Sequence, residues 1–210
     1  MKRTVKKPLE RKSDIVEAAR YLFQTKEYDK TTMQDVMDTL GIAKGTIYHY
    51  FESKDALLEA VIENIVDTTI ERMQTIVQKS TGTALEKMQM LVEAGRVATD
   101  NEDILANLHR PGNAGMHVRL LAATMVKQAP LYAQLIQQGC EEGVFQTTAP
   151  LECAEFIIAG IQFLTDTGIY AWSYEDVNRR ARAFPNLLEQ MLKALPGSFQ
   201  FMVHQILVSK

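Results

Sequence analysis

The chain has 210 residues, of which 46% are hydrophobic, and its formal net charge at neutral pH is −3. This length and apolar content suffice for one large or two small domains with a real core. The longest apolar run, residues 154–164, falls short of the roughly 20 residues that a helix needs to span a bilayer, so no membrane partner is expected.

Basic residues gather at the N-terminus, although the chain as a whole is slightly acidic. The first twelve residues hold six basic side chains and one acidic side chain, whereas the chain beyond residue 60 holds 12 Lys and Arg against 16 Asp and Glu. This distribution suits a protein that touches DNA with one end only, because phosphate binding relies on lysine and arginine. A solvated, disordered tail explains the arm itself equally well. The basic residues of this arm are Lys2, Arg3, Lys6, Lys7, Arg11 and Lys12.

Two features of the sequence indicate a reducing compartment. The N-terminal arm lacks the apolar stretch of a secretory signal. The two cysteines, Cys140 and Cys153, show neither a metal-binding nor a redox spacing, and we expect no disulfide between them. We therefore expect a cytoplasmic protein.

The first two predicted helices follow the arm. Apolar residues at positions 15, 18, 19, 22 and 23 repeat at helical spacing and predict the first helix. Thr31 and Gln34 have the spacing of a capping box, which predicts that the second helix begins at Thr31. Gly41 is expected to end that helix, because glycine adopts the left-handed conformation without a Cβ clash.

A third short helix is predicted over residues 43–50, directly after this turn. Its leading residues are expected to point toward the major groove of DNA, while Ile47 and Phe51 lie on the buried side. Gly45 costs about 1 kcal/mol inside a helix relative to alanine, which favours a position where a phosphate or base edge comes close. Ser53 then caps a fourth helix. The expected DNA contacts are Thr31, Thr32, Lys44, Gly45, Thr46, Tyr48, His49 and Lys54.

The rest of the chain reads as helix after helix, with no strand alternation and no internal repeat. Pro130 is expected to separate two helices, because proline lacks a backbone N–H and clashes with the preceding turn. The expected helices cover residues 54–81, 83–100, 102–110, 115–127, 131–142, 150–172 and 174–195, with a final short helix over 199–208.

The segment from Gly41 to Leu57 resembles the DNA-binding motif of the TetR family of transcriptional regulators. The likeness covers the first quarter to third of the chain, including the apolar spacing of the first helix. One departure is Ala43, where the family often has serine, which puts any contact from that position in doubt. The matching residues are Gly41, Lys44, Gly45, Thr46, Ile47, Tyr48, Phe51, Ser53, Lys54 and Leu57.

The resemblance implies an all-α fold in two parts. Residues 1–55 would form an arm and a three-helix helix-turn-helix domain, and residues 56–210 a larger helical domain for ligand binding and dimerisation. It also implies three partners, namely double-stranded operator DNA, a small-molecule effector and a second copy of the chain. The last two long helices would form the dimer interface, although apolar helical stripes are more often plain core. The interface candidates are Phe156, Ile157, Ile161, Leu164, Leu187, Leu188, Met191 and Leu195.

An effector pocket would lie among the middle helices. Methionines and aromatic residues there offer an adaptable, polarisable lining for a flat apolar ligand, but a methionine-rich core would look the same in sequence. The idea therefore depends on the family resemblance rather than on composition. The pocket candidates are Met88, Leu91, His109, Met116, Met125, Phe163, Tyr170 and Trp172.

The sequence shows no motif for catalysis, phosphate cradling or zinc binding. His109 and His117 lie eight positions apart across a Pro-Gly break, and we interpret them as two half-exposed histidines rather than as a metal site. No cofactor or metal is expected, and an enzyme is a distant hypothesis. The sequence thus favours a repressor that a small molecule releases from a palindromic operator. The alternative is an architectural or protein-recruiting DNA-binding factor without an effector.

Overall fold

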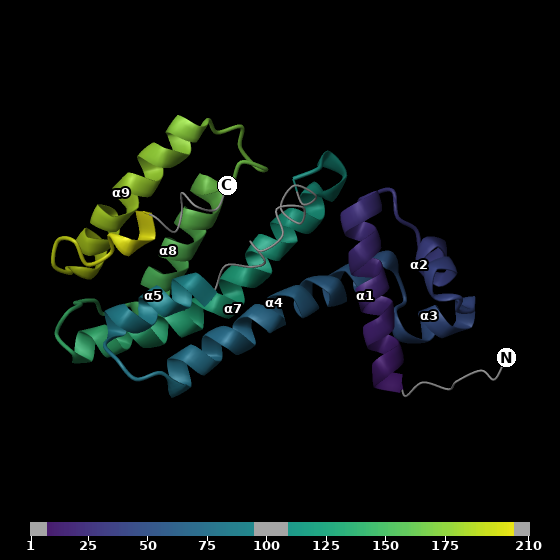
Figure 1. The fold of residues 1–210 in the computed structure, drawn as a ribbon, viewed down its shortest axis with the longest axis horizontal. Coiled ribbons are helices and arrows are strands. Elements are labelled where there is room, and N and C mark those ends of the chain that lie inside the picture. Colours follow the sequence, from purple (N-terminus) through teal and green to yellow (C-terminus); the bar gives the residue numbers. More distant parts are fainter. Residues whose placement is uncertain (1–7, 95–108, 204–210) are drawn as a thin grey trace.

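The computed structural model describes residues 8–94 and 109–203, and the regular structure in these ranges is helical throughout. Three helices form a head at one end of the molecule, and a fourth runs from the head into a larger helical body (Figure 1). The elements are α1 (Pro8–Lys26), α2 (Met33–Leu40), α3 (Lys44–Tyr50), α4 (Lys54–Lys79), α5 (Ala84–Ala94), η1 (Pro111–Asn113), α7 (Ala114–Glu141), α8 (Pro150–Thr165) and α9 (Tyr174–Leu192). The all-α prediction is confirmed.

Two of the predicted features lie outside the described residues. These are most of the basic arm and nearly all of the helix expected over 102–110. The helix expected over 199–208 is described only as far as residue 203. Among the described helices, none is long and apolar enough to cross a membrane.

The head is held together by the apolar residues whose spacing predicted its first helix. Ile15, Ala19 and Phe23 of α1 are fully buried, as is Ile47 of α3. Phe51, directly after α3, is also buried. Since Ile47 and Phe51 are four positions apart, they fall on one side of the short helix and anchor it in the hydrophobic core. The expected burial of both residues is confirmed.

The start of α2 lies one residue later than predicted. Thr32, not Thr31, is the N-cap, and its hydroxyl accepts a hydrogen bond from the backbone N–H of Asp35 at 3.2 Å. The Asp35 carboxylate in turn accepts from the Thr32 N–H at 2.7 Å, which completes a capping box. Thr31 with Gln34 and Thr32 with Asp35 both have the i,i+3 spacing of the motif. The burial of Thr31 decides between the two, because a buried hydroxyl cannot cap the exposed helix end.

The break predicted at Pro130 is wrong, because α7 continues through this residue. Pro130 is exposed, so the carbonyl that loses its N–H partner, that of exposed Val126, faces the solvent side of the helix. Its neighbours Ala129 and Leu131 are buried. Apolar packing on the inner side of α7 therefore outweighs the local preference of proline.

The helix predicted over 150–172 ends early, at Thr165. The side chain of Asp166 accepts hydrogen bonds from the backbone N–H groups of Gly168 and Ile169, both at 2.8 Å, and so turns the chain away from the helix axis. Ser173 and Asp176 then form the capping box of α9. That helix ends at Leu192 rather than at 195, because Lys193 adopts the left-handed conformation with φ of 50°.

The head and the body meet at a polar junction beside α4. The buried side chain of Asn113 accepts a hydrogen bond from the Tyr28 N–H at 2.6 Å and donates one to the Phe23 carbonyl at 3.2 Å. The Gly112 carbonyl accepts from the Asp29 N–H at 3.2 Å. The start of α7 is thereby fastened to the loop between α1 and α2.

Candidate nucleic-acid interface

Helices α2 and α3 are joined by a tight turn at Gly41. Its φ of 60° lies in the left-handed region, which favours glycine. The Gly41 and Ile42 N–H groups donate to the Asp38 and Met37 carbonyls, at 3.3 and 3.0 Å. These bonds satisfy the last carbonyls of α2 and redirect the chain into α3. Two short helices joined by such a turn have the arrangement of a helix-turn-helix unit.

One side of α3 is exposed, as predicted. Lys44, Gly45 and His49 are exposed, and the Tyr48 side chain has 43% of its surface accessible. The Lys44 ammonium lies 5.7 Å from the centre of the Tyr48 ring, so a positive charge and a planar ring share this surface. Thr46 is half-buried. The surface offers hydrogen-bond donors and a charge of the sign that phosphate groups attract.

Gly45 has no structural need to be glycine within the described chain. An added Cβ would meet no atom within 4 Å, and its φ does not lie in the left-handed region. Glycine nevertheless costs about 1 kcal/mol here relative to alanine. The described residues therefore give no structural reason for a glycine at this exposed position.

The assignment of Thr31 to a DNA contact is wrong. Its side chain is 1% exposed, and its hydroxyl donates to the Glu27 carbonyl at 2.7 Å.

Thr32 is exposed, but its hydroxyl caps α2. Its partner Asp35 also lies 2.7 Å from the Lys26 ammonium. The hydrogen bonds from Lys26 and then from Thr32 lower the pKa of Asp35 to about 2.

Lys54 has a role inside the head that the sequence did not indicate. Its ammonium donates to the backbone carbonyls of Tyr28 and Thr31, at 3.0 and 3.1 Å, and lies 4.2 Å from the centre of the Tyr28 ring. Two of its three N–H donors are thus used within the chain. The Tyr28 hydroxyl donates to Asp55 at 2.9 Å, and burial followed by this bond raises the pKa of Tyr28 to about 12. The phosphate contact of Lys54 stays a prediction.

The residues predicted to line an effector pocket have different surroundings in the described part of the chain. Of them, only Met88 lines the apolar cavity found between α5, α7, α8 and α9. Leu91 and Met116 are buried in the core, and Met125 packs against it. Phe163 is half-buried, whereas the tilted rings of Tyr170 and Trp172 lie with their centres 5.0 Å apart in the loop before α9. The cavity is lined by Met88, Val92, Tyr132, Ile136, Ala154, Ile157, Leu188, Leu192, Phe199, Phe201 and Met202.

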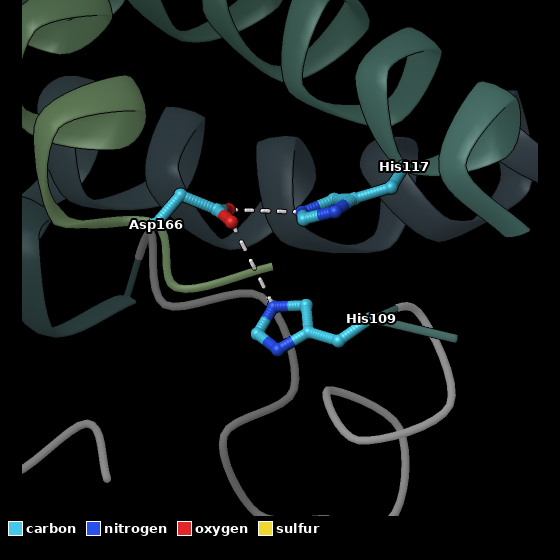
Figure 2. Close-up of side chains that lie close together, drawn as sticks. All are labelled: His109, His117 and Asp166. Carbon is cyan, nitrogen blue, oxygen red and sulfur yellow. Dashed lines mark ion pairs between the residues drawn. The ribbon is translucent and has the colours of Figure 1, made fainter. Parts of the chain in front are cut away.

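The interpretation of His109 and His117 as two half-exposed histidines is wrong for His117, which is buried. Its Nε2 lies 2.9 Å from a carboxylate oxygen of Asp166, and His109 approaches the same carboxylate (Figure 2). Burial lowers the pKa of His109, while the negative charge of Asp166 opposes the shift. Burial raises the pKa of Asp166, but the hydrogen bonds from His117 and from the backbone outweigh it, so this pKa is lowered.

The predicted interface residues fall into two groups. Phe156 and Leu195 are 71% and 77% exposed, and Leu164 and Leu187 are also exposed. The other four face inward or are half-covered. Leu188 is buried, Ile157 lines the cavity, Ile161 packs against the core and Met191 is half-buried. Burial of Leu188 within its own chain makes its assignment to a dimer contact wrong.

Comparisons with known protein families cover both parts of the chain. Residues 15–61 match the family described as bacterial regulatory proteins, tetR family. Residues 96–187 match a family described as Tetracyclin repressor-like, C-terminal domain.

Curated relatives match about a third of the chain. The HTH-type transcriptional repressor KstR2 of Mycolicibacterium smegmatis is 32% identical over 73 residues, which are 35% of this chain and 36% of that protein. The uncharacterized HTH-type transcriptional regulator YvdT of Bacillus subtilis is 37% identical over 60 residues, 29% of this chain and 31% of that protein. The chain thus matches about a third of the length of these relatives.

Solved structures match nearly the whole fold. A TetR-family transcriptional regulator from Pectobacterium atrosepticum has a TM-score of 0.63 at 20% identity and covers 91% of this chain and 98% of its own. A SmeT–triclosan complex has a TM-score of 0.63 at 14% identity and covers 90% of this chain and 94% of its own. At these identities the likeness concerns the fold.

The position of Lys54 predicts that it stabilises the head. Replacing Lys54 with alanine should lower the free energy of unfolding by about 2 kcal/mol, because two backbone carbonyls lose a charged hydrogen-bond donor. Lys44→Ala is the matched control, since the exposed side chain of Lys44 makes only a ring contact. The free energy of unfolding of this variant should stay within about 0.5 kcal/mol of the wild-type value. Urea unfolding of the three proteins measures the difference. Equal stabilities of the two variants would show that Lys54 is not a structural residue.

Proposed function

Because the chain belongs to the TetR family of DNA-binding transcriptional regulators, we propose that it is a repressor that binds a palindromic operator as a homodimer and leaves it when an effector binds the body. Residues 1–55 serve as the DNA-binding unit and residues 56–210 as the regulatory and dimerisation unit. Such a regulator works in the cytoplasm. The exposed surface of α3 is the observation that carries the proposal.

The exposed side of α3 supports the DNA-binding part of the proposal. The buried anchors Ile47 and Phe51 hold the helix against the head, so its other side faces outward. That side presents Lys44, Gly45 and Tyr48. An α-helix fits the major groove of B-DNA, and residues at its leading end reach base edges and phosphates there. We assign Lys44, Tyr48 and His49 to these contacts, and Gly45 to the closest approach of the backbone.

Exposed apolar side chains on α8 and α9 support a dimer. Phe156 and Leu164 lie on α8, and Leu187 lies on α9. Large apolar residues gathered on adjacent helices are typical of a protein-binding surface. These helices lie at the far side of the body from the head (Figure 1). Pairing through them leaves both copies of α3 free to meet half-sites about 34–36 Å apart, or a multiple of that spacing.

The apolar cavity supports an effector of low polarity. Tyr132 supplies the one hydroxyl of its lining, and the other lining side chains are apolar. The solved relative in complex with triclosan shows that a protein of this fold binds a compound of that kind. The cavity holds about 30 Å³, less than the several hundred that ligand pockets have. Binding therefore requires its flexible methionines, Met88 and Met202, to change rotamer.

The alternative function keeps the same DNA-binding surface without an effector. In that case the protein acts as an architectural or protein-recruiting factor, and the small cavity is ordinary packing space. The two functions differ in one measurable property. Operator affinity depends on a small molecule only in the first.

The DNA-binding surface is tested by selecting, from random duplexes, the sequence that the purified protein binds. We expect a palindrome, because a two-fold symmetric dimer reads two equal half-sites. Gly45→Ala should then raise the free energy of unfolding by up to about 1 kcal/mol and yet weaken operator binding at least tenfold, since the methyl group blocks the close approach. Lys44→Ala and Tyr48→Ala should also weaken binding without unfolding the protein.

The matched control is Gly115→Ala in α7, where an added Cβ also meets no atom within 4 Å. This variant should keep the operator affinity of the wild type. If Gly45→Ala, Lys44→Ala and Tyr48→Ala all bind the operator with unchanged affinity, α3 is not the reading element.

The effector is tested by measuring operator affinity across a panel of flat apolar compounds. At least one should release the protein from DNA, since a ligand that favours one state shifts the equilibrium. Met88→Ala should change the dissociation constant of that compound at least fivefold. Met90→Ala, an exposed neighbour on α5 that does not line the cavity, should leave it unchanged. A panel in which no compound alters operator affinity or melting temperature would favour the alternative function.

A further inference from the structure

Three side chains that are distant in the sequence meet beside the N-terminal end of α7. His117 belongs to α7, His109 precedes η1, and Asp166 directly follows α8 (Figure 2). The His117 Nε2 lies 2.9 Å from one Asp166 oxygen, and the His109 Nε2 lies 3.9 Å from the other. One ligand atom from each residue can be chosen so that all three lie within 4.8 Å of one another.

We propose that His109, His117 and Asp166 bind a divalent transition-metal cation, with Zn²⁺ as the fitting ion. In a tetrahedral zinc site with bonds of about 2.0–2.1 Å, ligand atoms are separated by roughly 3.3 Å. The two observed nitrogen–oxygen separations lie on either side of this value, and all three ligand atoms lie within 4.8 Å of one another, so side-chain rotations are needed to close the site. Two imidazoles with one carboxylate are a ligand set that zinc accepts, and the fourth position is left for water or another donor.

The loop after α8 orients the carboxylate for this task. The backbone N–H groups of Gly168 and Ile169 both donate to Oδ1 of Asp166, which leaves Oδ2 directed at His117. Metal-binding carboxylates are usually held in this way by surrounding hydrogen bonds. Gly168 also makes room for the second histidine, because an added Cβ would lie 2.2 Å from the His109 ring.

A hydrogen bond between His117 and Asp166 explains only part of the arrangement. That pair is satisfied without His109, yet the centre of the His109 ring lies 5.1 Å from that of His117 at an angle of 36°. The two rings therefore do not stack, and both present Nε2 to the same carboxylate. A shared cation gives the second imidazole a partner.

The position of the site links it to the DNA-binding head. His109 is four residues before Asn113, whose side chain bonds to Phe23 and Tyr28. Between them, the Arg110 guanidinium donates to the Thr25 carbonyl at 3.4 Å. A cation that holds His109 also restrains this segment against the head. Metal binding itself does not depend on the proposed function, so the two are tested separately.

The test is titration of Zn²⁺ into the tag-free, full-length protein after removal of metals by a chelator. Isothermal calorimetry should show one Zn²⁺ bound per chain. Co²⁺ should give the visible absorption of a tetrahedral site, and Zn²⁺ should displace it. Zn²⁺ should also raise the melting temperature, since a ligand that binds only the folded state stabilises it.

Two variants and one control decide whether the cluster is the site. His109→Ala removes a half-exposed ring, and Asp166→Asn keeps an acceptor for the two backbone N–H groups, so both are chosen to preserve the fold. Each should weaken Zn²⁺ binding at least tenfold and abolish the cobalt absorption. His49→Ala removes an exposed histidine of the head, and this control should bind Zn²⁺ with the affinity of the wild type. Absence of saturable binding by the wild type, or wild-type affinity in His109→Ala, overturns the proposal.

Discussion

The buried hydrogen bonds of Asn113 determine how the DNA-binding head stands on the body. This one side chain joins the start of α7 to the end of α1 and to the loop that follows it, through the Phe23 carbonyl and the Tyr28 N–H. Loss of the amide would remove the partner of the Phe23 carbonyl, where the bond is buried, and of the Tyr28 N–H, where it is part-buried. An unpaired buried backbone group costs about 1–3 kcal/mol. Helix α4 is the second connection, and its Lys54 bonds to the same loop. With the Gly112 carbonyl and the Arg110 guanidinium, which also bond to the head, these connections restrain the head against the body.

The same junction gives the body a physical route to the head. Helix α7 lines the apolar cavity with Tyr132 and Ile136, holds His117 of the proposed metal site and begins beside Asn113. From residue 113 to residue 132 an α-helix extends about 28 Å. A rigid element of that length transmits a rearrangement at one end to the other. A ligand acts through it only if it binds one position of α7 more tightly than another.

Local signals explain why the head was predictable from sequence. The turn at Gly41, the cap at Ser53 and the buried pair Ile47 and Phe51 each depend on residues within one or two helical turns, and the structure confirms them. The capping box of α2 was misplaced by one residue, because two adjacent threonines each have an eligible partner three positions on. Only the burial of Thr31, a tertiary effect, decides between them.

The remaining features depend on contacts that the sequence does not order. Asp166 joins His109 and His117 only because α8 packs against α7, and no spacing along the chain indicates this meeting. The continuity of α7 through Pro130 likewise follows from packing on its inner side. The cavity residues come from four helices and the segment after α9, so composition alone placed only Met88 among them.

The most direct measurement is the distance between a spin label on the head and one on the body. The labels are attached at Glu52→Cys and Gln137→Cys, which are both exposed positions. Cys140 and Cys153 are first replaced by serine, so that only these two sites react. Labelled chains are diluted with unlabelled ones, so that the distance within one chain is measured. We predict one narrow distance distribution for this protein, and a clearly broader one when Asn113→Ala is added. Asn64→Ala, on the exposed side of α4, should leave the distribution narrow. An equally narrow distribution in the Asn113 variant would contradict the account.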